Sequence, residues 1–199
     1  MERKAHGAFG RSGRRLGSDA MRTRLIALSL AAASLPTAAS AGGPEFWDDA
    51  SRAGEVSLVA GGFALNAARG DEDGALQLAG SLGAAFATTE ILKRTFPTLR
   101  PDGSDRRSFP SGHTSVSFAA AASIHRRHGW EAGVPAMVVA GVVGYARVRA
   151  DRHRWEDVIV GAAIGEAVGF LISRPRNSNV ALVPWASTRE AGVTVSAAF

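Results

Sequence analysis

The sequence predicts an all-α protein, an antiparallel bundle of about five helices with a short C-terminal β-hairpin. Three observations support this fold class. Long stretches rich in alanine, glycine and other apolar residues fill most of positions 45–172. Prolines and glycine-containing turns separate these stretches. Strand-like alternation of apolar and polar residues appears only in the tail after position 177.

Each helix is bounded by residues that favour a helix end. Pro44 suits the first turn of the first helix, and Gly70 follows its last residue, before a turn-like segment at 71–74. Pro97 and Pro175 cannot continue a helix, and Gly129 is a plausible C-cap. We therefore expect helices over residues 45–69, 75–95, 112–128, 135–149 and 154–172.

The tail has a different pattern. Segments 180–185 and 193–199 alternate in the manner of strands around a turn at 187–192. A single hairpin cannot close a barrel, so we expect it to pack against the bundle.

The N-terminal segment is typical of an export signal. Arg22 and Arg24 precede an apolar stretch at 25–35, and Ala39-Ser40-Ala41 offers a small-residue cleavage site. We expect residues 1–41 to be a signal peptide with an N-terminal extension, Met21 being a possible true start, or alternatively an uncleaved anchor. Residues 42–176 would then form one helical domain and 177–199 the hairpin tail. The chain has no cysteine, so the fold must depend on packing alone.

Charge argues against a nucleic-acid partner. The formal net charge is +5, but seven of the 23 cations and only two of the 18 anions lie in residues 1–41. The remaining 158 residues carry 16 of each sign and are neutral overall.

The helices are rather short for membrane spans. The apolar stretches near 134–148 and 158–172 hold 15 residues each, against the roughly 20 needed to cross a bilayer. Glu90 and Glu166 also interrupt the apolar helices. This favours a soluble or peripheral bundle in the periplasm, with a bundle embedded in the inner membrane, its site facing the periplasm, as the alternative.

Three short motifs in the second half of the chain carry the candidate chemistry. They are Lys93–(six residues)–Arg100–Pro101, then Pro110–Ser111–Gly112–His113, then Arg147–(five residues)–His153–(three residues)–Asp157. In an antiparallel bundle the loop between the second and third helices lies at the same end as the loop between the fourth and fifth. All three motifs should therefore meet at one mouth.

The third motif combines a nucleophile with a group that can orient it. A pair spaced i, i+4 on a helix lies on one face, so Asp157 can accept a hydrogen bond from one ring nitrogen of His153. The other nitrogen is then free to attack. A surface His–Asp pair or a zinc half-site, with His113 as the third ligand, remains an alternative.

The remaining motif residues suit a tetrahedral anion. Lys93, Arg100 and Arg147 supply positive charge, and arginine can grip a phosphate through its planar fork. Ser111 and Gly112 open a helix, where free amide donors favour an anion. Ser111 could equally be an ordinary N-cap. His113 is placed to protonate a leaving oxygen.

Together the motifs resemble the signature of the type 2 phosphatidic acid phosphatase superfamily (PAP2), which also includes bacterial acid phosphatases and vanadium haloperoxidases. The resemblance covers about residues 75–172, and segment 145–165 follows the third motif closely. One position departs, because the family usually has serine where this chain has Ala146.

The resemblance implies a metal-free, cofactor-free phosphatase that vanadate inhibits as a phosphate mimic. His153 would form a phosphohistidine, Asp157 would orient it, and His113 would act as general acid and then base. Lys93, Arg100, Arg147, Ser111 and Gly112 would hold the phosphoryl oxygens.

The expected substrate is a phosphate ester, with lipid phosphates or pyrophosphates favoured if the bundle lies on or in a membrane. Soluble esters are the alternative in the periplasm. A haloperoxidase or a noncatalytic envelope protein are less favoured functions, and the oligomeric state stays open.

Overall fold

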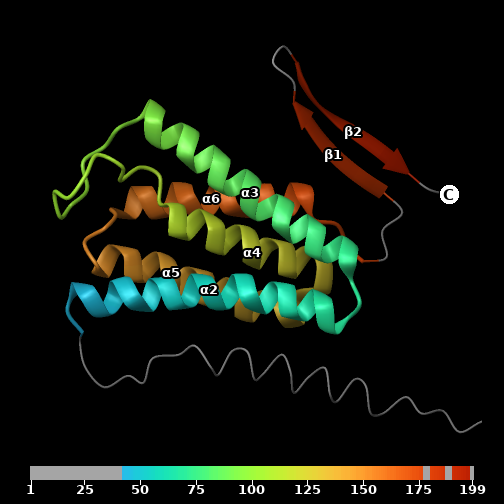
Figure 1. Ribbon diagram of the computed structural model, residues 1–199, viewed down its shortest axis with the longest axis horizontal. Coiled ribbons are helices and arrows are strands. Elements are labelled where there is room, and N and C mark those ends of the chain that lie inside the picture. Colours follow the sequence, from blue (N-terminus) through green and yellow to red (C-terminus); the bar gives the residue numbers. More distant parts are fainter. Residues whose placement is uncertain (1–41, 177–179, 187–189, 198–199) are drawn as a thin grey trace, which may run out of the picture.

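The computed structural model of the chain describes residues 42–176, 180–186 and 190–197. The expected signal peptide at 1–41 lies outside the described residues. The described part contains five helices, as predicted, and two strands (Figure 1). Their bounds are α2 Pro44–Ala68, α3 Glu72–Thr95, α4 Gly112–His128, α5 Trp130–Arg149, α6 Trp155–Ile172, β1 Val180–Ala186 and β2 Ala191–Ala197.

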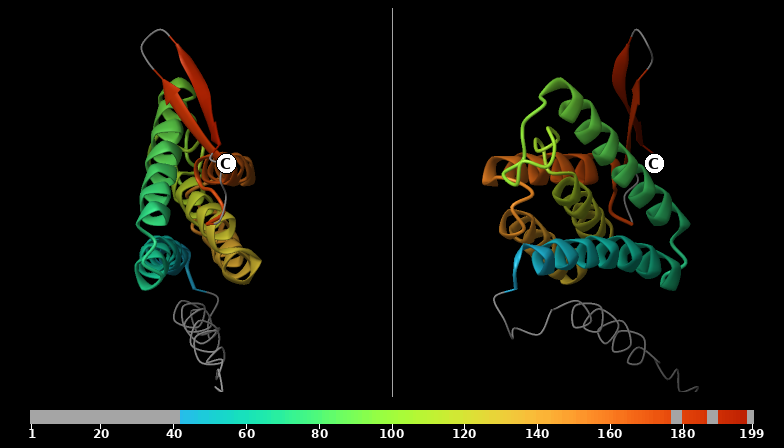
Figure 2. Two further views of the ribbon diagram at one scale, coloured as in Figure 1. Left: turned by 90° about the vertical axis from the view of Figure 1, so that its right-hand side faces the viewer. Right: turned by 60° about the vertical axis from the view of Figure 1, so that its left-hand side comes forward.

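Helix α4 is the centre of the bundle and packs against each of the other four helices (Figure 2). Its buried face consists mainly of alanine, serine and threonine, which let neighbouring backbones approach closely. The facing side of α6 carries Gly161, Gly165 and Gly169 at intervals of four residues. A Cβ at Gly169 would lie 2.7 Å from the Ala119 carbonyl oxygen, so only glycine fits there without a shift of the helices.

Two helices begin earlier than the sequence predicts. Helix α3 begins at Glu72 rather than near 75, because the side chain of Asp71 caps it by accepting a hydrogen bond from the Gly74 amide at 3.0 Å. The turn expected at 71–74 is thus the cap and first turn of α3. Helix α5 begins at Trp130 and contains Pro135, which was expected to start it. A proline in the second turn removes one helical hydrogen bond, and here the helix continues through it.

The bundle has two distinct ends. The start of α2, the α3–α4 loop and the α5–α6 loop lie together at one end, on the left of Figure 1, which we call the site end. The α2–α3 and α4–α5 connections lie at the other end, as expected for an antiparallel arrangement.

The C-terminal strands form an antiparallel pair, with register from Val180↔Ala197 to Ala186↔Ala191. In Figure 1 the pair projects from the bundle, with β1 next to α6. The expected packing of the hairpin over the bundle is therefore limited to this contact.

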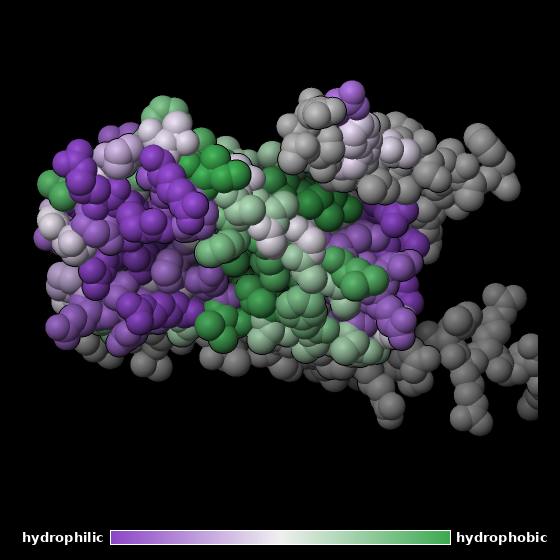
Figure 3. All heavy atoms as spheres, turned by 45° about the horizontal axis from the view of Figure 1, so that its top comes forward, coloured by the Kyte–Doolittle hydropathy of each residue, from purple (hydrophilic) through white to green (hydrophobic). Residues whose placement is uncertain are grey.

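Exposed apolar side chains cover the middle of the bundle. One face is shown in Figure 3, where a hydrophobic band separates two hydrophilic ends. We call the exposed apolar side chains along the four outer helices the apolar belt: Val56, Phe86, Ile91, Val134, Val138, Val142 and Ile159. Within the described residues, α5 is the one helix long and apolar enough to cross a membrane by length and composition.

Candidate active site

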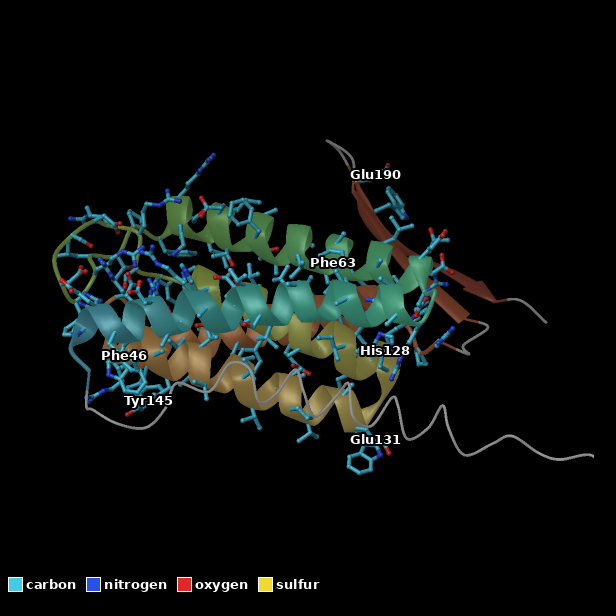
Figure 4. The ribbon with its side chains drawn as sticks, turned by 60° about the horizontal axis from the view of Figure 1, so that its bottom comes forward. Phe46, Phe63, His128, Glu131, Tyr145 and Glu190 are labelled. Carbon is cyan, nitrogen blue, oxygen red and sulfur yellow. The ribbon has the colours of Figure 1, made fainter. Side chains whose placement is uncertain are left out.

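The structure brings all three predicted motifs to the site end. Figure 4 shows nitrogen- and oxygen-bearing side chains crowded at this end, which is also marked by Phe46 and Tyr145, while His128 and Glu131 mark the other end. The α3–α4 and α5–α6 loops are tied together there. Arg152 donates a hydrogen bond to Asp102 at 2.9 Å, and Arg154 donates to the Leu99 carbonyl oxygen at 2.9 Å.

His153 lies in the short loop between α5 and α6, and its side chain is only 2% exposed. Its Nδ1 is 3.6 Å from the Asp157 carboxylate, and its Nε2 is 3.4 Å from Nη1 of Arg100. A guanidinium can only donate, so this contact requires Nε2 to be the unprotonated nitrogen and leaves the proton on Nδ1. The geometry therefore presents the lone pair of Nε2 toward a cation.

Burial and nearby cations keep the imidazole of His153 neutral. Burial lowers the pKa of His153 below its usual value, although Asp157 opposes the shift. Three cations lower it further: Arg147, Arg100 and Lys93. All three predicted phosphate-binding cations thus act on one ring, and a neutral imidazole is the form that can attack an electrophile.

Asp157 holds its place through several partners. Its Oδ2 accepts hydrogen bonds from the Ser108 hydroxyl at 2.6 Å and from the Arg154 amide at 2.9 Å. Burial alone would raise the pKa of Asp157, but His153 and these two donors lower it to about 2. The expectation that His153 and Asp157 share a helix face is wrong in detail, because Arg154 is the N-cap and only Asp157 lies in α6.

Lys93 and Arg100 approach from the α3 side. The ammonium of Lys93 is buried and donates to the carbonyl oxygens of Arg107 at 2.7 Å and Pro110 at 2.5 Å. Burial, with Arg100 and Arg107 nearby, lowers the pKa of Lys93 to about 8. Arg100 also donates through Nε to Asp105 at 2.7 Å, which fixes its guanidinium beside His153.

Arg147 is held from α2. It is 4% exposed, and its Nη1 donates to Asp48 and, at 3.1 Å, to the Ser51 hydroxyl. Its Nε is buried with no hydrogen-bond partner among the described residues, so donor capacity remains for a ligand. Ala146 beside it is fully buried, and the hydroxyl near Arg147 comes from Ser51.

The second motif forms the start of α4, as predicted. Ser111 is the N-cap residue, yet its side chain makes no capping hydrogen bond and instead accepts from the Thr114 hydroxyl at 2.9 Å. The Ser111 amide donates to the Asp157 carbonyl oxygen at 2.9 Å, which joins the second motif to the third. The helix begins at Gly112, so its first amides have no acceptor within α4 and can serve an anion.

His113 lies one residue further along α4, with its side chain 33% exposed. Its Nε2 is 3.4 Å from the carboxylate of Glu55, which projects from α2. Burial lowers the pKa of His113 to about 3, and Arg147 and His153 contribute to the shift.

Sequence reasoning missed four polar residues that surround the motifs. Ser108 lies in the loop before the second motif, where no local pattern distinguishes it. Asp48, Ser51 and Glu55 could have been found, because their spacing of three and four residues makes one polar face on α2.

The comparisons with known proteins agree with this fold and these motifs. A sequence profile of the PAP2 superfamily matches residues 74–180. Lipid A 1-phosphatase of Porphyromonas gingivalis is 42% identical over 82 residues, covering 40% of this chain and 18% of that protein. Probable diacylglycerol pyrophosphate phosphatase 1 of Schizosaccharomyces pombe is 34% identical over 82 residues, covering 34% and 29%.

A similar fold is known from the crystal structure of Aquifex aeolicus LpxE. It superposes with a TM-score of 0.51 and 21% identity, covering 76% of this chain and 85% of that one. The aligned segments of the two curated relatives amount to less than a third of either protein's length.

Proposed function

The chain belongs to the PAP2 superfamily, and from that membership and the geometry of the site we propose that it is a metal-independent phosphatase acting through a phosphohistidine. The observation that carries the proposal is the placement of His153. One ring nitrogen faces Asp157, the other faces Arg100, and three cations act on a buried neutral ring.

In the first step, Nε2 of His153 attacks the phosphorus atom and the bond from phosphorus to the leaving oxygen breaks. Lys93, Arg100 and Arg147 stabilise the charge on the other phosphoryl oxygens, together with the first amides of α4. Asp157 keeps the proton on Nδ1 and stabilises the positive charge that develops on the ring.

His113 completes the chemistry from the start of α4. It donates a proton to the departing oxygen in the first step. In the second step it takes a proton from a water molecule, which attacks phosphorus and releases His153.

We further propose that the substrate is a lipid phosphate or pyrophosphate. The apolar belt supports this, because a large exposed apolar surface marks contact with a partner or a membrane. Exposed Trp130 lies at one edge of the belt, and exposed Tyr145 and Trp155 lie at the other, where aromatic residues favour a membrane interface. The two curated relatives are also named for lipid substrates.

The location follows the same reasoning. We propose an exported, membrane-associated protein. Its apolar belt contacts lipid, and its site end faces the periplasm. Washing isolated membranes with carbonate and then extracting them with detergent tests this placement. Recovery of the protein in the soluble periplasmic fraction would contradict it.

The decisive experiment measures phosphate release from a panel of lipid phosphates, lipid pyrophosphates and soluble esters. We expect activity on the lipid substrates that persists in EDTA, is inhibited by vanadate and disappears in His153→Ala. His125→Ala, at the exposed far end of α4, is the matched control and should keep wild-type activity.

The panel also distinguishes the alternatives. Preference for soluble esters would replace the lipid substrate while keeping the reaction. Full activity in His153→Ala would refute the role of His153 as the nucleophile. If no substrate released phosphate, the proposed phosphatase activity would be refuted.

A further inference from the structure

Glu55, on α2, is the acidic side chain that contacts the proposed general acid. Its Oε2 lies 3.4 Å from Nε2 of His113, and its side chain is 23% exposed. This is the only ion-pair contact of Glu55 among the described residues. Helix α2 precedes residues 74–180, so Glu55 lies outside the segment that matches the family.

We propose that Glu55 is a positioning residue that holds His113 by its Nε2 and supplies the proton that His113 passes to the leaving group. The proposal rests on the proposed phosphatase function and concerns the step in which the leaving oxygen departs. It assigns to α2 a direct part in the reaction.

The charges around the pair explain why His113 needs such a partner. Burial lowers the pKa of His113 to about 3, so this imidazole is neutral near pH 7 and cannot act as an acid alone. Burial raises the pKa of Glu55 to about 7, so its carboxyl group is partly protonated there. The charged and titratable groups that act on the pair come from α2, α5 and the α5–α6 loop: Asp48, Arg52, Arg147 and His153.

The proton balance is simple. The carboxyl group of Glu55 gives its proton to Nε2 of His113 while Nδ1 gives its own proton to the leaving oxygen. The products are an alcohol, a neutral imidazole with its proton on the other nitrogen, and a Glu55 carboxylate. When water attacks the phosphohistidine, the same transfers run backwards and restore protonated Glu55.

An alternative role for Glu55 is purely structural, in which it fixes α2 against α4. A structural role would lower activity equally for every substrate. A role in proton supply affects only substrates whose leaving group needs a proton, and this difference makes the proposal testable.

The experiment compares Glu55→Gln with wild type on two soluble substrates, n-decyl phosphate and p-nitrophenyl phosphate. The alkyl alcohol is a poor leaving group and needs a proton, whereas the nitrophenolate leaves without one. The measured quantity is kcat/KM, because it reports the steps up to departure of the leaving group. Glu72→Gln, exposed at the opposite end of the bundle, is the matched control.

We expect Glu55→Gln to lower kcat/KM on the decyl ester about 100-fold, at the low end of what general acid catalysis contributes, and on the nitrophenyl ester less than threefold. In wild type, kcat/KM on the decyl ester should also fall as pH rises past about 7, where Glu55 loses its proton. This decline should be absent in Glu55→Gln.

Three outcomes separate the possibilities. Equal losses on both esters, or an unchanged pH profile, would overturn the role of Glu55 while leaving the phosphatase intact. Wild type inactive on both esters and on the lipid panel would refute the proposed function itself, and this inference with it. If Glu55→Gln fails to fold, Glu55→Asp, which keeps the carboxyl group, must show the same substrate difference in weaker form or the proposal fails.

Discussion

Replacing Asp157 with asparagine removes a buried negative charge while preserving the shape of the side chain. The pKa of this carboxyl falls from 3.8 to about 2 in the folded protein, and its side chain is only 4% exposed. A lowered pKa means that the folded state favours the charged form. By linkage, the shift corresponds to about 2 kcal/mol of folding free energy at pH 7.

The direction of the pKa shift determines the pH range in which Asp157 stabilises the folded protein. The stabilisation from Asp157 is fully present above the unfolded pKa and is lost as pH falls through the folded value near 2. We therefore expect Asp157→Asn to be less stable than wild type by about 2 kcal/mol at pH 7, and by roughly half as much near pH 3. Urea unfolding of both proteins at pH 7, 5, 4 and 3 measures this difference directly.

The Asp157→Asn variant should also have a lower kcat than wild type. Asparagine carries no negative charge to favour the Nδ1 proton of His153 or to stabilise the ring as it becomes positive, so kcat should fall by about 100-fold to 10,000-fold. The substrate-binding cations are untouched, and KM should change little. A stability difference independent of pH would refute the linkage argument, and a kcat close to wild type would refute the orienting role of Asp157.

Three further outcomes follow from the structure. Gly169→Ala should lower the free energy of unfolding by about 1–3 kcal/mol, because its Cβ would meet the α4 backbone at 2.7 Å. Gly83→Ala, in an open position on α3, should stabilise by about 0.5–1 kcal/mol in the same urea titration. Asp48→Asn should lower the melting temperature by leaving buried Arg147 poorly paired, yet added phosphate should raise it more than in wild type. No extra phosphate effect would mean that Arg147 does not meet the anion.

The fold was largely readable from the sequence. Five apolar stretches separated by prolines and glycines predicted five helices, and the bundle has them. The errors lie at helix starts. The sequence predicts a turn at Asp71, which instead caps α3, and a helix start at Pro135, which instead lies inside α5. Both residues favour more than one local structure, and tertiary packing decides between them.

The site was partly readable. The motif spacing and the antiparallel order correctly predicted that Lys93, His113 and His153 share one end of the bundle. The hydrogen-bond partners could not be predicted, because they depend on side-chain contacts between elements distant in sequence. Ser108 and Asp157 are 49 residues apart, and Asp48 and Arg147 are 99 residues apart.

Helix α2 lies before the segment that matches the family, yet it contacts two of the motif residues. The matched segment contains every motif residue, and the reaction that we propose is based on those residues. Yet Arg147 is held by Asp48 and Ser51, and His113 faces Glu55, all from α2. These contacts set how free the arginine is to meet phosphate and how readily the histidine obtains a proton. If the proposed mechanism holds, its rate depends on a helix that the motifs do not include, and variants in α2 would measure that contribution separately from the motif residues.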